Sequence, residues 1–79
     1  MPTKAELERK SLTELAVLCG KIDGNSASDR STADKAHVLR LEWVQLEHPP
    51  RSATREGKEL EAQRESLRKR MVEFLAGAL

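Results

Sequence analysis

The most reactive side chains in this sequence are one cysteine and two histidines, Cys19, His37 and His48. A cysteine nucleophile needs a histidine base within hydrogen-bond reach and a third polar group that orients the base. No motif in the chain sets these side chains at such a spacing, and the sequence has neither a glycine-rich phosphate loop nor a nucleophile-elbow motif. We therefore predict that Cys19 is a small core residue, that both histidines are partly exposed helix residues, and that the chain is not an enzyme.

The sequence also predicts no metal or cofactor site. A single cysteine excludes an intrachain disulfide and a multi-cysteine zinc cluster. Asp23 and Asn25 are typical of the opening of a calcium loop, but Ala27 stands where a third oxygen ligand is required and no glutamate closes the loop. The glutamates alternate with lysine and arginine, which is typical of solvated faces and not of a buried acid and base. We expect no catalytic, metal-binding or cofactor-binding residue.

A basic cluster in the last third of the chain could contact phosphate groups. Its members are Arg64, Arg68, Lys69 and Arg70. Cationic side chains in such a row can neutralise a nucleic-acid backbone, but glutamates at positions 61, 65 and 73 are interleaved with them and would repel it. A small nucleic-acid-binding regulator, in which a dimer adds two clusters together, is therefore our second hypothesis, behind a solvated, salt-bridged face.

Composition places the chain among small single domains. The 79 residues are 38% hydrophobic and 34% charged with a formal net charge of +1, so residues 1–79 can form one helical domain and no second one. A domain this small buries too little surface to be more than marginally stable alone, so self-association is expected. The sequence has no run of apolar residues that could cross a membrane and no signal-peptide pattern at its start, which together with the lone thiol favours the cytoplasm.

Two capping boxes mark the first helical region, TKAE at residues 3–6 and SLTE at residues 11–14. In a capping box the hydroxyl and the carboxylate satisfy free backbone N–H groups at a helix start. We predict one helix over residues 4–22, with residues 4–10 either continuing it or forming a separate turn. Small polar residues then predict a flexible loop at residues 24–32.

The second predicted helix, at residues 32–48, contains the only tryptophan and the densest apolar run in the chain. One apolar face repeats at helical spacing: Ala33, Ala36, Leu39, Trp43 and Leu46. A second row extends the apolar surface: Val38, Leu41 and Val44. A helix that is apolar on two sides is typically covered by a neighbour on each, so we predict a central helix with Trp43 as the main anchor of the core. Two prolines after His48 end it.

The third predicted helix, at residues 52–77, is long and carries an apolar C-terminal face. The residues predicted to bind a partner there are Leu67, Met71, Phe74 and Leu75. Because this helix would overhang two shorter neighbours, its apolar end would need a partner. The predicted fold class is all-α, a small three-helix bundle that self-associates. The first functional hypothesis is a small helical interaction module, such as an adaptor, antitoxin, anti-activator or phage-type inhibitor, that binds another protein through this face.

Overall fold

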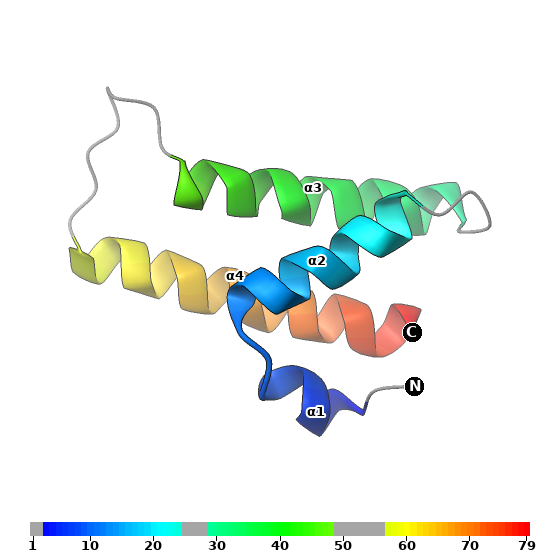
Figure 1. Cartoon of the computed structure of the whole chain (residues 1–79), viewed down its shortest axis with the longest axis horizontal. Helices are drawn as coiled ribbons and strands as arrows, with labels where there is room; N and C mark the ends of the chain where they lie inside the picture. Colours follow the sequence, from blue (N-terminus) through cyan, green and yellow to red (C-terminus); the bar gives the residue numbers. More distant parts are fainter. Residues whose placement is uncertain (1–2, 25–28, 49–56) are drawn as a thin grey trace.

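The structure is a computed structural model that describes residues 3–24, 29–48 and 57–79. All regular structure in these ranges is helical: α1 (Lys4–Glu8), α2 (Leu12–Asp23), α3 (Arg30–Glu47) and α4 (Gly57–Ala78) (Figure 1). The all-α prediction is confirmed, and α2, α3 and α4 correspond to the three predicted helices. The predicted start of the last helix, at residues 52–56, and residues 25–28 of the predicted loop lie outside the described residues.

The first helical region is divided into two helices, so of the two alternatives left open for residues 4–10, the separate turn is the one that forms. The hydroxyl of each predicted capping box caps its helix. The backbone N–H of Glu6 donates to Oγ1 of Thr3 at 3.2 Å, and that of Glu14 donates to Oγ of Ser11 at 3.2 Å. An N-cap residue has an extended backbone, and Ser11 has φ −71° and ψ 162°, which no helix interior allows. The second box therefore interrupts the first helix and lets the chain change direction.

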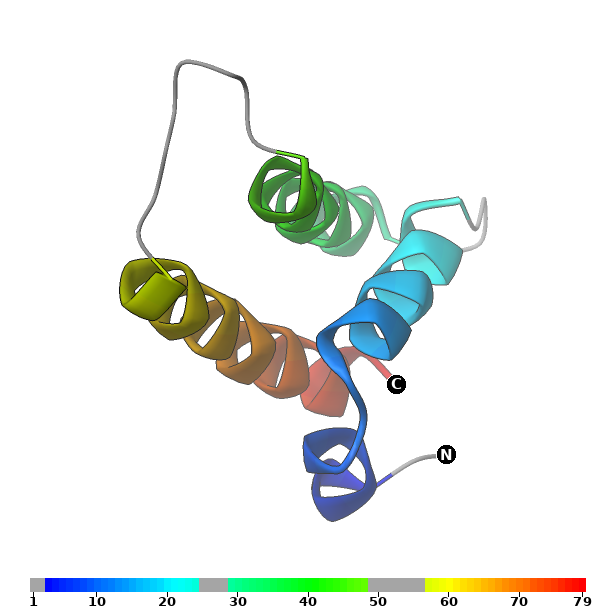
Figure 2. The same cartoon turned by 60° about the vertical axis from the view of Figure 1, so that its left-hand side comes forward.

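Helix α1 uses that change of direction to fold back over the C-terminal half of α4 (Figures 1 and 2). Leu7 is completely buried there, and Nζ of Lys4 lies 2.6 Å from Oε1 of Glu73. Nη1 of Arg68 donates to the backbone carbonyl of Glu8 at 2.8 Å, which satisfies one of the carbonyls left free at the end of α1. Helix α2 is about 18 Å long against about 33 Å for α4, so α2 alone could not cover its neighbour.

Helices α2, α3 and α4 pack pairwise around one hydrophobic core. The buried apolar residues come from all four helices: Leu7, Leu15, Ala16, Cys19, Ile22, Ala36, Leu39, Leu46, Leu67, Met71, Val72 and Leu75. The radius of gyration of the Cα atoms is 13.0 Å. One contiguous core of this size is what a single small domain can build.

The two ends of α3 follow from its sequence. Asp29 occupies the N-cap position, and the helix begins at Arg30, two residues before the predicted start. At the other end the backbone N–H of His48 still donates to the carbonyl of Val44 at 2.8 Å, but its φ of −131° and ψ of 65° are no longer helical. A following proline disfavours helical geometry at the residue before it, which is consistent with the end of α3 at this point.

Only one side of α3 is buried, so the prediction that it is a central helix covered on both sides is wrong. Helices α2 and α4 both lie on the same side of α3, below it in Figure 2. Ala36, Leu39 and Leu46 face them and are buried. The second apolar row remains exposed: Val38 at 53%, Leu41 at 47% and Val44 at 39%.

Trp43 is also not the main anchor of the core. It is partly buried and packs against the edge of the core, whereas the completely buried large side chains are mainly leucines and Met71. Its indole Nε1 is buried without a hydrogen-bond partner. Trp43 also lines a hollow at the surface between α2 and α3, so part of the indole stays exposed.

Candidate interaction surface

The C-terminal face predicted to bind a partner lies inside the protomer. Leu67, Met71 and Leu75 have no exposed surface, and Phe74 is partly buried against the core. The periodicity identified the apolar face of α4 correctly, but α1 and α2 already cover it. These three side chains are therefore not available to a second molecule while the domain is folded.

The basic residues of α4 do not form one free surface. Nη2 of Arg64 lies 3.2 Å from Oε2 of Glu47 at the end of α3, and both terminal guanidinium nitrogens of Arg70 contact Glu42 of α3, at 2.6 and 3.2 Å. Arg64 and Arg70 therefore join α4 to α3.

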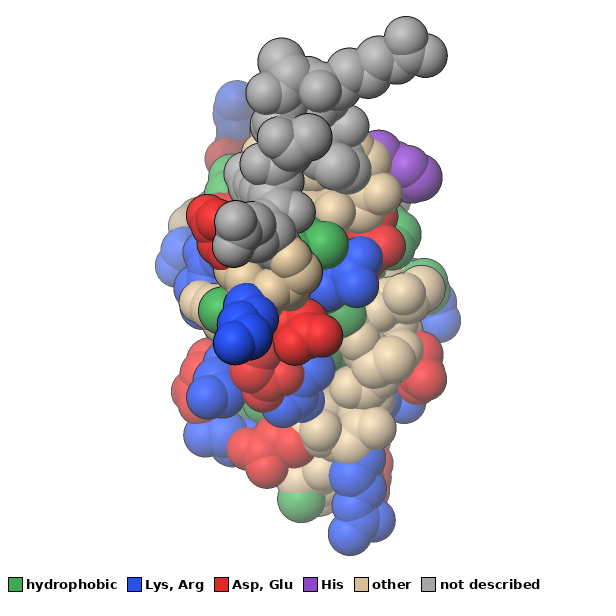
Figure 3. Space-filling model, turned by 90° about the vertical axis from the view of Figure 1, so that its left-hand side faces the viewer, with side chains coloured by type: hydrophobic (Ala, Val, Ile, Leu, Met, Phe, Trp, Pro, Cys, Tyr) green, Lys and Arg blue, Asp and Glu red, His purple; other side chains and the backbone are tan. Residues whose placement is uncertain are grey.

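Arg68 contacts its own helix and α1. Besides the carbonyl of Glu8, it contacts both carboxylate oxygens of Glu65, at 2.8 and 3.1 Å. The hydrogen bond from Arg68 holds the pKa of Glu65 below its usual range and raises the pKa of Arg68. Lys69 is exposed. The arginines thus join α4 to its neighbours, and Figure 3 shows acidic and basic side chains intermixed on the face that it displays.

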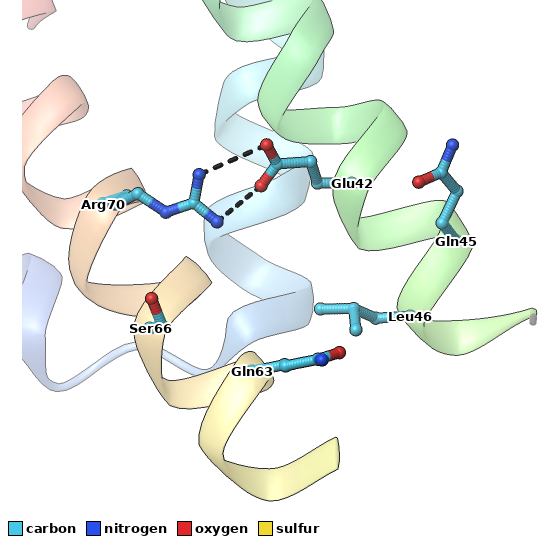
Figure 4. A pocket seen from close by; sticks show the side chains of 6 residues that line it. All are labelled: Glu42, Gln45, Leu46, Gln63, Ser66 and Arg70. Atoms are coloured by element: carbon cyan, nitrogen blue, oxygen red, sulfur yellow. Dashed lines mark hydrogen bonds and ion pairs between the residues drawn. The ribbon is translucent and has the colours of Figure 1, made fainter. Parts of the chain in front are cut away.

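A shallow groove between α3 and α4 is polar along most of its length (Figure 4). Its lining consists of Glu42, Gln45, Leu46, Gln63, Ser66 and Arg70. The two charged side chains are bonded to each other across the groove, so their charges are largely compensated. The groove offers hydrogen-bonding groups but no unbalanced charge.

Cys19 and the two histidines lie in different environments, the cysteine in the core and the histidines at the surface. Cys19 is completely buried, and burial raises the pKa of its thiol to about 11, against a smaller opposing effect of Arg40. His37 is exposed and its Nδ1 lies 3.1 Å from Oδ2 of Asp23, the same oxygen that accepts a hydrogen bond from Arg40 at 3.2 Å. His48 is exposed at the end of α3. The thiol is therefore held as a protonated core group, and the prediction for Cys19 is confirmed.

A set of three or more metal-ligating side chains does not occur within residues 3–24, 29–48 and 57–79. Over the same ranges, none of the helices combines the length and the apolar composition that crossing a membrane requires.

The most distinctive surface is the outer row of α3, formed by Val38, Leu41 and Val44. These residues follow one another at intervals of three along a helix of 18 residues, so they lie close together on the side that faces away from α2 and α4. Exposed large apolar side chains are common singly, but three in a row on one face are typical of a contact surface. Sequence reasoning found this row and assigned it to the core, because the pattern of one helix does not show on which side its neighbours pack.

Val17 on α2 is the remaining large apolar side chain that is strongly exposed in the described part of the chain, at 54%. It lines a hollow between α2 and α3 together with Gly20, Arg40 and Trp43. At Gly20 a side chain would come within 3.3 Å of the Cδ atom of Arg40, so the small residue lets Arg40 lie across α2.

Comparisons with protein-family models, with curated proteins and with solved structures found no significant match to this chain.

Proposed function

We propose that this chain is a small, non-enzymatic, helical protein–protein interaction module whose binding surface is the outer row of α3. The observation that supports the proposal is the exposure of Val38, Leu41 and Val44 on one face of a helix whose opposite face is packed into the core. An amphipathic helix with apolar residues at such intervals is a common way for proteins to recognise one another. The proposal keeps the class of function predicted from the sequence and moves the surface from α4 to α3.

The outer row has the composition of an interface centre. Its three aliphatic side chains are between 39% and 53% exposed, and completing the burial of each would contribute on the order of 1 kcal/mol. Polar residues such as Asp34 and Gln45 surround it on the same helix and are exposed. An apolar centre with a polar rim is typical of interfaces between soluble proteins.

We place this interaction in the cytoplasm, where a chain with one unpaired thiol would stay reduced. We do not extend the proposal to nucleic acid. Arg64, Arg68 and Arg70 are engaged by carboxylates of this chain, and a phosphate backbone would have to displace them.

Affinity capture with matched baits tests the proposal. Three tagged chains are compared by quantitative mass spectrometry on a lysate of the source organism: wild type, Leu41→Asp and Ala62→Asp. Ala62 is exposed on α4, so its variant adds the same charge at a site away from the outer row. We expect a protein retained by wild type and Ala62→Asp to be lost with Leu41→Asp, and a purified mixture of the two to reproduce this. Equal retention by all three baits would contradict the proposal.

A further inference from the structure

We propose that residues 4–23 switch between the bent form described above and one continuous straight helix, and that Arg68 is the latch that holds the bent form. This inference is independent of the outer row of α3, because it concerns the joint between α1 and α2. Figures 1 and 2 show the joint as a short bend through which the chain passes from α1 into α2. The two forms differ in the backbone of this joint and in the position of α1.

The joint is close to helical already. Arg9 has a helical backbone, with φ −83° and ψ −14°, whereas Ser11 is extended, with φ −71° and ψ 162°. Lys10 lies between them, and its N–H donates to the carbonyl of Leu7 at 3.0 Å, the tighter spacing that is frequent at helix ends. A straight helix therefore requires only that Ser11, with its neighbour Lys10, becomes helical.

The local sequence permits both forms. Residues 3–19 contain neither proline nor glycine, and most of them are strong helix formers. Glu6, Lys10 and Glu14 follow one another at intervals of four, so they would form two attractive pairs along one continuous helix. Ser11, in contrast, is a good N-cap and favours a new helix start at the bend. Contacts with the rest of the fold therefore decide between the two forms.

Helix α1 is held on α4 by few contacts. Leu7 is the only buried side chain within residues 3–10, and the pair between Lys4 and Glu73 is exposed on both sides. A hollow at the surface between the two helices is lined by Glu8, Arg68, Lys69, Val72 and Glu73. A helix of five residues is not stable by itself, so α1 depends on these few contacts for its place in the fold.

Arg68 occupies an acceptor that the straight form needs. Its Nη1 donates to the carbonyl oxygen of Glu8 at 2.8 Å, while its Nε and Nη2 are held by the carboxylate of Glu65. In a straight helix this carbonyl would accept the N–H of Leu12, four residues further on. In the bent form Leu12 is the first residue of α2, where an N–H has no acceptor within the helix. The bond from Arg68 therefore exists only in the bent form and stabilises it.

Straightening changes which apolar surface is exposed. In the bent form Leu7 is completely buried. A straight helix carries Leu7 away from α4 and opens the side of α4 on which it lay. The loss of one buried leucine is partly offset by new backbone hydrogen bonds at the joint, so we expect the straight form at roughly 1–10% of the wild-type population. The latch thus couples the backbone at Ser11 to the exposure of α4.

NMR spectroscopy on the purified full chain tests the latch, with Arg68→Ala and Arg70→Ala as matched variants. Arg70 pairs with Glu42 of α3, so its variant removes an arginine of α4 that joins a different helix. Arg68→Ala should raise the population of the straight form about tenfold, with helical Cα chemical shifts at Ser11 and slower amide exchange at Leu12. Arg70→Ala should match the wild type.

Two results with Arg68→Ala would overturn the proposal. In the first, the chemical shifts at Ser11 stay as in the wild type or change equally in Arg70→Ala. In the second, residues 4–8 lose their helical shifts while the joint gains none, which would mean that α1 frays and does not continue into α2.

The two helix caps give a second test that leaves Arg68 in place. Ser11→Ala removes a cap that exists only in the bent form, whereas Thr3→Ala removes a cap that both forms share, because the helix begins at Lys4 in each. Ser11→Ala should raise the population of the straight form about fivefold, and Thr3→Ala should leave it unchanged. Ser11→Ala combined with Arg68→Ala should be mainly straight, with more helix by circular dichroism than the wild type. Equal effects of the two cap variants, or a loss of helix in the combined variant, would contradict the switch.

Discussion

The outer row of α3 and the C-terminal face of α4 have similar apolar patterns and opposite exposure. Leu67, Met71 and Leu75 on α4 have no exposed surface, whereas Leu41 on α3 is 47% exposed. The difference comes from a third segment, because α1 folds back onto α4 and no described helix does the same for the outer side of α3. An apolar stripe thus predicts that a helix face will be buried. The path of the chain decides whether another segment of the same chain buries it.

Matched leucine substitutions should give the largest difference between the two faces. Leu67→Ala should lower the free energy of unfolding by about 2–5 kcal/mol, because it leaves a cavity in a close-packed core. Leu41→Ala should lower it by less than about 1 kcal/mol, because half of the side chain is already in water. Urea unfolding at low protein concentration measures both. Similar losses for the two variants would mean that the outer row is buried in solution.

Trp43→Ala should have an intermediate effect on stability. The side chain is partly exposed at the edge of the core, so we expect a loss of about 2–3 kcal/mol, below the roughly 3–5 kcal/mol of a fully buried aromatic. Trp43→Phe should recover a large part of this, because it removes an indole N–H that is buried without a partner. Thermal unfolding followed by circular dichroism compares the three chains. Complete loss of cooperative unfolding in Trp43→Ala would make the tryptophan the anchor that the sequence predicted.

The buried thiol of Cys19 predicts that the stability of the fold depends on pH. Folding raises the pKa of Cys19 from 9.0 to about 11, so above pH 9 the unfolded chain loses this proton while the folded chain keeps it. The associated stability is complete below pH 9 and should fall by on the order of 2 kcal/mol as the pH rises to about 11. Urea unfolding at several pH values, with Cys19→Ala as the control for lysine titration, measures the difference. An equal decline in both chains would contradict the burial of the thiol.

The ion pair between Arg70 and Glu42, which joins the two compared helices, should have the smallest effect. The side chain of Arg70 is 53% exposed and that of Glu42 is 36% exposed, so solvent screens their attraction even though the contact has two hydrogen bonds. A double-mutant cycle with Arg70→Ala and Glu42→Ala should give a coupling energy of about 0.2–1 kcal/mol that falls as salt is added. A coupling above about 2 kcal/mol, or one insensitive to salt, would mean that the groove between α3 and α4 is closed to water.

Local sequence signals were sufficient to predict where most of the helices lie and which face of α4 is buried. The hydroxyls of Thr3 and Ser11 predicted both helix starts, the prolines after His48 predicted the end of α3, and the period of Leu67, Met71 and Leu75 identified the inner face of α4. These signals act within one or two helical turns, so they do not depend on the rest of the chain. The fold class followed from them.

The tertiary structure alone decided which apolar faces are covered and which carboxylate each arginine meets. Whether SLTE interrupts the first helix depends on whether α1 gains more by packing on α4 than by continuing into α2, and that gain comes from residues far along the chain, as the contact of Arg68 with Glu8 illustrates. The same holds for Arg64 and Arg70, whose partners Glu47 and Glu42 lie on another helix. Because burial depends on contacts between distant segments, the sequence could name the outer row of α3 but only the packing of α2 and α4 on one side of it could leave it exposed.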